Sequence, residues 1–172
     1  MTLPEQTAIL LEAIEDELLQ PEDIVRWADP IIVAMEKPPM WIIDLSTLGT
    51  PHMVDCVWRL REQATEQLPQ HCRIQIVALA HQAALISSSA ALSKLFRIKF
   101  IERRNTRTDT VERLDEELNV MLIKWDCQDD LDVIEPPFQE KLNALFREYL
   151  KNADDVVAIL PWKFSSSAQK GV

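Results

Sequence analysis

Glycine is the residue type that this sequence lacks most clearly. The 172-residue chain has only two, Gly49 and Gly171. Glycine provides the positive φ angles of tight hairpin turns and lets phosphate-binding loops approach their ligand closely. Two glycines this far apart cannot form a G-x-G-x-x-G fingerprint or a P-loop. The shortage argues against a hairpin-rich sheet and a nucleotide-binding loop, and it favours a helical fold.

Cysteine is also scarce. Cys56, Cys72 and Cys127 are an odd number without the spacing of a disulfide framework. No Lys or Arg precedes Arg26, so the first residues do not resemble a secretory signal. We therefore expect a cytoplasmic protein in a reducing compartment.

The longest apolar segment has no charge at all. Residues 74–93 contain no Asp, Glu, Lys or Arg, although charged residues make up 27% of the chain. In a soluble protein such a segment must be covered on most sides, and helices with apolar stripes can cover it. Its Gln, His and Ser residues make it too polar for a transmembrane span. The sequence thus predicts a core segment and no membrane association.

The secondary structure of this core segment is open. Ile74, Val77, Ala78 and His81 share one helical face, but residues 74–77 and 96–100 are also rich in residue types that suit strands. The alternative to an all-α fold is therefore a small α/β arrangement with strands near 41–46, 74–80 and 96–101.

Amphipathic helices are indicated elsewhere by apolar residues three and four apart. These segments are residues 3–19, 21–35, 51–68, 109–125 and 136–150, with a short element after Asp154. In the second segment, residues 21–35, Pro30 should kink the helix or make Asp29 the cap of a new one.

We predict a single all-α domain over residues 1–162, a bundle of six to eight helices, followed by a flexible tail at 163–172. Residues in the middle of the stripes should be buried, namely Trp27, Leu60, Leu118, Trp125 and Phe146.

Residues 19–46 contain a pattern of prolines and tryptophans: Pro21-Glu22, Trp27-Ala28-Asp29 and Pro38-Pro39, then Trp41, Ile43 and Leu45-Ser46. This pattern is similar to a segment of small helical bacterial proteins without an assigned function. The resemblance covers 28 of the 172 residues. It implies a helical beginning in a bacterial protein and no activity.

Charge is distributed unevenly along a chain whose formal net charge is −10. Residues 1–36 carry nine acids and one base, residues 37–108 ten bases and five acids, and residues 109–155 fourteen acids and five bases. One interpretation is internal neutralisation, and the other is an acidic surface presented to a basic partner protein. The candidate partner-binding residues lie in the first helix and in an acidic loop: Glu12, Glu15, Asp16, Asp129, Asp130 and Asp132.

Metal sites match the sequence poorly. The loop after residue 125 places Asp126, Gln128, Asp130 and Asp132 at alternating positions, as calcium loops do. Its sixth position is Leu131 where glycine is needed, and its twelfth is Pro137 where a glutamate is needed. For zinc, His52 and Cys56 are four residues apart, but adjacent His71 and Cys72 suit one ion badly. We predict no metal and no cofactor.

Two further segments have residue types that could act chemically. His81 with Ser87–Ser89 could supply a base and a nucleophile, although no G-x-S-x-G elbow surrounds them and the serines suit a helix cap. Residues 94–107 carry six bases against Glu102, a possible phosphate-binding strip in a protein whose overall charge opposes such binding.

Three functions are compatible with these observations. The first is a non-catalytic helical interaction module, such as an adaptor or an immunity-type inhibitor, whose acidic surface binds a basic protein. The second is an enzyme whose site is assembled from distant residues. The third is a nucleic-acid-binding regulator that uses residues 94–107. The sequence favours the first.

Overall fold

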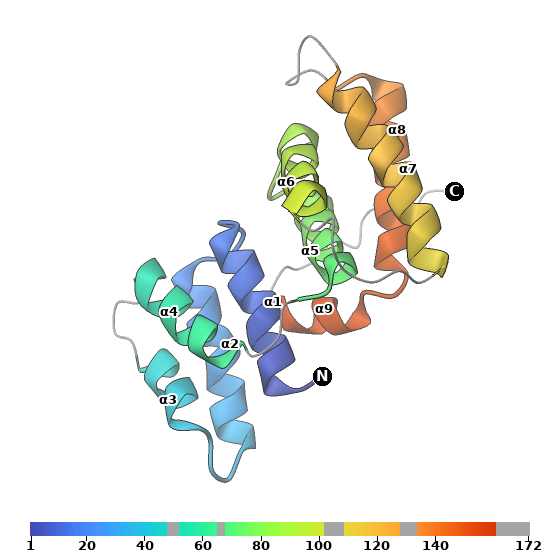
Figure 1. The fold of residues 1–172 in the computed structure, drawn as a ribbon. Coiled ribbons are helices and arrows are strands. Elements are labelled where there is room, and N and C mark those ends of the chain that lie inside the picture. Colours follow the sequence, from blue (N-terminus) through green and yellow to red (C-terminus); the bar gives the residue numbers. More distant parts are fainter. Residues whose placement is uncertain (48–51, 65–67, 102–108, 128–133, 161–172) are drawn as a thin grey trace, which may run out of the picture. The chain divides into compact units, whose positions relative to one another are not determined.

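The computed structural model describes residues 1–47, 52–64, 68–101, 109–127 and 134–160. These ranges contain helices and no strand (Figure 1). The helices are α1 (Leu3–Glu15), α2 (Pro21–Ala34), α3 (Met40–Ser46), α4 (Met53–Gln63), α5 (Gln70–Gln82), α6 (Ser88–Ile101), α7 (Asp109–Asp126), α8 (Pro136–Leu150) and α9 (Asp154–Ile159). The predicted all-α class is confirmed, with nine helices within the described ranges in place of six to eight.

The three segments for which strands were the alternative are helical, in α3, α5 and α6. Seven consecutive residues of α5, from Ile74 to Ala80, are buried. A helix that is apolar around its whole circumference has to be enclosed in this way, so burial overrides the strand preference of its β-branched residues. None of the helices in the described ranges has the length and apolar character that a membrane-spanning segment requires.

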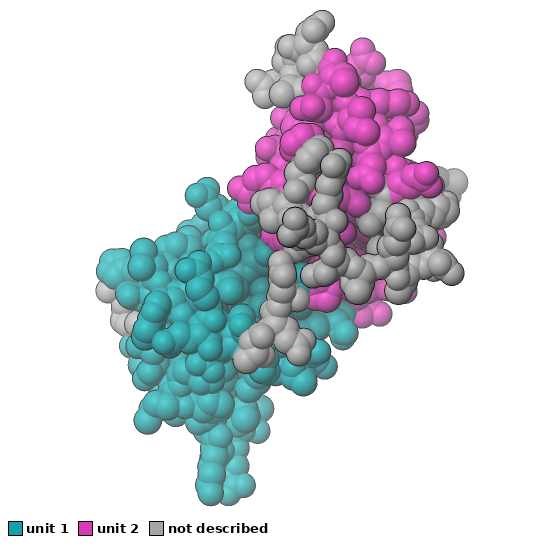
Figure 2. Space-filling view, viewed as in Figure 1, with its two compact units in different colours: residues 1–68, 155–161 teal, residues 69–154, 162–172 magenta. Residues whose placement is uncertain are grey.

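The chain divides into two compact units, which Figure 2 shows in different colours. Unit 1 contains residues 1–68 and 155–161, and unit 2 contains residues 69–154 and 162–172. The single domain predicted for residues 1–162 stays a prediction. The tail predicted for residues 163–172 lies outside the described residues.

In unit 1, α1 packs against α4 and α2 packs against α3. A capping box begins α1: the Glu5 N–H donates to Thr2 Oγ1 (3.4 Å), and the Thr2 N–H donates to the Glu5 carboxylate (2.7 Å). Arg59 of α4 pairs with Asp44 of α3, with Nη1 and Oδ2 2.7 Å apart. The buried side chains of the first four helices include Ile9, Leu10, Ala13, Ile14, Ile24, Ala28, Ile42, Leu45, Cys56 and Leu60. The inward faces of α1, α2 and α4 thus lie within segments for which apolar stripes were predicted, although Leu11 of α1 and Val57 of α4 are only half-buried.

Trp27 departs from the prediction because it is half-buried rather than buried. Its ring stacks on that of Trp41, with the ring centroids 6.2 Å apart, and its Nε1 donates to Gln6 Oε1 (3.2 Å). A buried tryptophan needs a partner for its N–H, and Trp27 finds one at the edge of the unit. The apolar spacing of residues 21–35 also predicts that Ile31 and Met35 face inward, but Ile31 is half-buried and Met35 is exposed.

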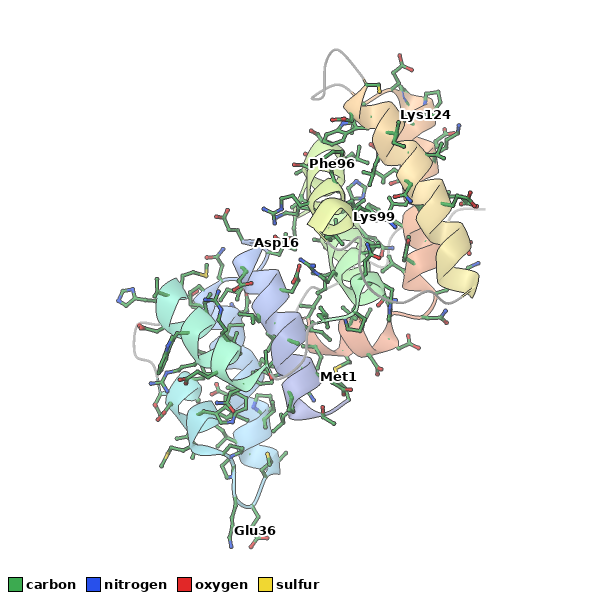
Figure 3. All side chains as sticks on the ribbon, viewed as in Figure 1. Met1, Asp16, Glu36, Phe96, Lys99 and Lys124 are labelled. Atoms are coloured by element: carbon green, nitrogen blue, oxygen red, sulfur yellow. The ribbon has the colours of Figure 1, made fainter. Side chains whose placement is uncertain are left out.

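Pro30 does not divide α2, which runs from Pro21 to Ala34 with the proline inside it. The predicted new cap at Asp29 is therefore wrong, and the Asp29 carboxylate instead accepts a hydrogen bond from the Ser46 hydroxyl of α3. This contact ties α2 to α3 across the exposed turn that carries Glu36 (Figure 3).

In unit 2, four helices pack as a closed ring: α5 contacts α6 and α8, and α7 contacts α6 and α8. Their shared core contains Ile74, Val77, Ala78, Ala91, Leu92, Leu95, Ile98, Leu118, Met121, Leu122, Trp125, Leu142, Leu145, Phe146 and Tyr149. Phe96 packs edge-on against Trp125, with the ring centroids 6.4 Å apart. The predicted burial of Leu118, Trp125 and Phe146, like that of Leu60 in unit 1, is confirmed.

Two contacts show that α5 and α8 run antiparallel. Near the start of α5, Gln75 Nε2 donates to the carbonyl oxygens of Tyr149 (3.0 Å) and Asn152 (3.2 Å), at the end of α8. Near the end of α5, His81 lies against Phe146, with the ring centroids 5.3 Å apart. Gln75 is buried, and its amide supplies the partners that the last carbonyls of α8 lack within their own helix.

Helices α1 and α5 end in the left-handed conformation without glycine. Glu17 and Ala84 have φ angles of 60° and 58°. After α1, Leu18 N–H donates to the Ala13 carbonyl (2.8 Å), and after α5 Leu85 N–H donates to the Ala80 carbonyl (2.9 Å). Both are Schellman ends. The turn at Glu17 also explains why α1 stops at Glu15 and not at residue 19.

Replacing Leu118 by alanine should lower the free energy of unfolding by about 2–5 kcal/mol, because the side chain is 0% exposed and its loss leaves a cavity. Val120→Ala on the exposed face of α7 is the control and should change it by less than about 0.5 kcal/mol. Denaturant titration measures both. Equal, small effects would contradict the packing of α7.

Ala84→Gly should raise the free energy of unfolding by about 0.5–1 kcal/mol, because glycine adopts a φ of 58° without the steric cost that alanine bears. Ala83→Gly is the matched control: this neighbour has a φ of −76°, so glycine there only adds unfolded-state entropy and should lower stability. Thermal or denaturant unfolding compares the two. A loss of stability in both variants would show that the left-handed turn is absent.

Candidate interaction groove

An open groove of about 900 Å³ lies between α7 and α8 of unit 2. Its apolar lining is Val120, Met121, Pro137, Phe138, Ala144 and Leu145, and its charged lining is Glu116, Glu117, Lys124, Glu135, Lys141 and Glu148. We call this feature the α7–α8 groove.

The apolar floor of the groove follows from how the two helices use their stripes. Met121 and Leu145 are buried because they also belong to the core of unit 2. Half-buried Phe138 packs against the same core. Val120, one helical step further round α7, remains 50% exposed. The groove is therefore the outer flank of the core, and its floor is held in place by packing.

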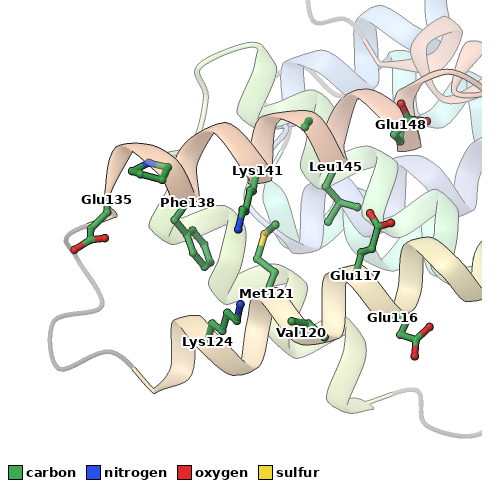
Figure 4. A pocket seen from close by; sticks show the side chains of 12 residues that line it. Glu116, Glu117, Val120, Met121, Lys124, Glu135, Phe138, Lys141, Leu145 and Glu148 are labelled. Carbon is green, nitrogen blue, oxygen red and sulfur yellow. The ribbon is translucent and has the colours of Figure 1, made fainter.

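Charges are sorted along the groove (Figure 4). Glu116, Glu117 and Glu148 lie towards one end, and Lys124 and Lys141 lie further along, before Glu135 at the opposite end. Glu148 pairs with Lys151, whose Nζ is 2.8 Å from Oε1. Four acids against two bases give the lining an acidic balance with one clearly negative end.

The apolar surface continues from the groove onto the outside of α7. Ile123, one turn after Val120, is 61% exposed. Isolated exposed apolar side chains are ordinary, but two together beside an apolar groove are typical of a binding surface. Val120 and Ile123 do not lie on the helical face that carries Leu118 and Trp125, which was predicted to be buried. Two apolar residues outside that face are the sequence signal that could have indicated the groove.

The predicted partner-binding residues of α1 differ in their exposure. Glu15 is exposed and pairs with Arg61 of α4. Glu12 is half-buried. Asp16 is buried, 8% exposed, so the expectation that it faces outward is wrong. The Schellman end turns the chain at this residue (Figure 3), whereas the prediction assumed a helix that continues to residue 19.

The remaining candidates of the acidic loop, Asp129, Asp130 and Asp132, lie outside the described residues. So do residues 102–107 of the basic segment at residues 94–107. Of its described members, Lys94, Arg97 and Lys99 each take part in interactions within the protein.

Within the described ranges, no group of three His, Cys, Asp or Glu side chains is placed to hold a metal ion. Of the residues considered for zinc, Cys56 is buried in unit 1 while His52 is exposed. Burial raises the pKa of the Cys56 thiol, which stays protonated and packs as a small apolar side chain.

The structure does bring His81 and Ser88 together. Nε2 of His81 lies 2.8 Å from Oγ of Ser88, and so the end of α5 is tied to the start of α6. Ser87 acts as the cap expected from the sequence, since its Oγ accepts the Ala90 N–H (3.2 Å). Partial burial lowers the pKa of His81, so its neutral imidazole is a hydrogen-bonding partner for the hydroxyl. The contact stabilises the turn between two core helices.

Comparison of the chain with family models, curated proteins and solved structures finds no match.

The lowered pKa of His81 predicts a pH-dependent stability. Desolvation disfavours its charged form in the folded state, so the unfolded state binds the proton more readily. The contribution of His81 is complete above the unfolded pKa of 6.5 and declines as the pH falls through the folded value. Unfolding free energies of wild type and His81→Gln should therefore differ most above pH 6.5 and converge at lower pH. A difference that is constant with pH would contradict the burial of the imidazole.

Proposed function

We propose that this protein is a non-catalytic helical interaction module that binds a basic partner protein through its acidic surface. The observation that carries the proposal is the α7–α8 groove, an open apolar surface bordered by more acids than bases. Protein-binding grooves combine such an apolar centre with a polar rim.

The overall charge supports a basic partner. A net charge of −10 gives a long-range field that attracts a positively charged surface before contact. Contacts of this kind raise the association rate more than they deepen the affinity. Pairs such as Glu15 with Arg61 account for part of the acidic surface by internal neutralisation, so we assign binding to the groove and not to α1.

The proposal includes a cytoplasmic location. It is supported by Cys56, Cys72 and Cys127, which form no disulfide and would suit a reducing compartment.

Reversing one acid at the groove tests the proposal. A partner is first captured from the native cell with the tagged protein and purified. Its association rate should then fall about three- to tenfold for Glu116→Lys at low salt, because a basic surface would meet a cation at the groove. Glu140→Lys, an exposed residue of α8 that does not line the groove, changes the net charge equally and should slow association less.

Stopped-flow or surface-binding kinetics at several salt concentrations measure these rates. An association rate that ignores both salt and the reversal of Glu116 would show that the acidic surface does not recruit the partner.

A further inference from the structure

The α7–α8 groove has the dimensions and chemistry of a site for one helix. We propose that it binds an amphipathic helix of the partner, whose apolar stripe packs on Val120, Met121 and Leu145 and whose basic residues lie over Glu116 and Glu148. This inference rests on the proposed function, and it names the occupant of the groove.

The shape of the walls favours a helix over an extended peptide. Extended peptides bind by adding main-chain hydrogen bonds to a sheet edge, whereas both walls here are helices whose interior backbone groups are already paired. A helix satisfies its own backbone, and the side-chain ridges of one helix fit the groove between two others. The occupant would thus add a third helix to the α7–α8 pair.

The length of the groove sets the length of the occupant. Its lining along α8 runs from Glu135, the N-cap residue of the helix, to Glu148. At a rise of about 1.5 Å per residue, this distance is about 20 Å, so the occupant needs about 14 residues, or four turns. Over four turns, apolar residues at i, i+3, i+4 and i+7 would cover the floor.

The sorted charges set the direction of the occupant. Its basic residues should meet the end with Glu116 and Glu148, and its acidic residues should meet Lys124 and Lys141 (Figure 4). The positive end of its own dipole, the N-terminus, is also stabilised near carboxylates. We therefore place the N-terminal half of the occupant at the Glu116 end, so that it runs in the direction of α7.

Two synthetic 14-residue helical peptides test the occupant and its direction. Both carry the same leucine stripe and a side-chain staple on the opposite face, which equalises their helix content because lysines near an N-terminus oppose the dipole of the free helix. One has lysines in its first half and glutamates in its second, and the other has these halves exchanged. In fluorescence anisotropy at physiological salt, the first peptide should bind about threefold or more tightly than the second. Equal binding of the two peptides would overturn the direction.

A carboxylate in the apolar lining of the groove separates docking from charge attraction alone. Ala144 lines the groove and is exposed, so Ala144→Glu should leave the fold intact and make the protein more acidic. It should nevertheless weaken the first peptide about tenfold or more, because the new carboxylate would be desolvated against the leucine stripe. Asn143→Glu is the matched control, with the same charge change on an exposed residue outside the groove, and should keep the affinity within about twofold.

Binding that is unchanged or stronger in Ala144→Glu would overturn the groove as the docking site. Self-association that is seen in sedimentation for wild type and lost in Ala144→Glu would also overturn it, by making a second copy of the chain the occupant. The native partner separates this inference from the proposed function. Equal capture of that partner by wild type and Ala144→Glu would be compatible with an interaction module but would contradict the groove as its docking site. A wild-type protein that captures no basic partner would contradict the proposed function itself.

Discussion

The enclosure of α5 is the constraint on which unit 2 depends. Every residue from Ile74 to Ala80 is buried, including the polar side chain of Gln75. A segment without charge can leave water only if other helices bring apolar stripes to it, and α6 and α8 do so. The buried Gln75 amide adds a directional requirement, because it must meet the carbonyls of Tyr149 and Asn152. Together these contacts determine where α8 lies and which of its faces is turned inward.

The groove is a consequence of that arrangement. Leu118 of α7 and Leu142 of α8 point fully into the core. Residues three positions further along each helix, Met121 and Leu145, therefore lie where the two helices meet and line the groove. Met121 and Leu145 belong to both the core and the groove floor, which links the rigidity of the floor to the stability of the bundle. A pre-organised floor reduces the entropy lost when a partner binds. The same residues thus serve folding and, in our proposal, recognition.

The shortage of glycine has a structural counterpart. Glu17 and Ala84 take left-handed positions that other proteins commonly give to glycine, and each bears a steric cost there. Contacts outside the turns hold both ends in place: Leu18 is buried after α1, and the His81–Ser88 contact spans the turn after α5. Tertiary contacts of this kind offset local strain.

The sequence by itself favoured an all-α fold and determined the inward faces of the later helices, whereas the choice between helix and strand at residues 41–46, 74–80 and 96–101 was decided only in the folded protein. Apolar spacing is a local property, so it located Leu118, Trp125 and Phe146 without knowledge of their neighbours. It could not decide what happens where elements meet. Half-buried Trp27, buried Asp16 and the early end of α1 depend on contacts between residues distant in the sequence or on a turn that lacks its usual glycine. The groove also depends on tertiary structure, because it is formed by side chains of both α7 and α8. Apolar periodicity within one helix does not show which other helix packs beside it.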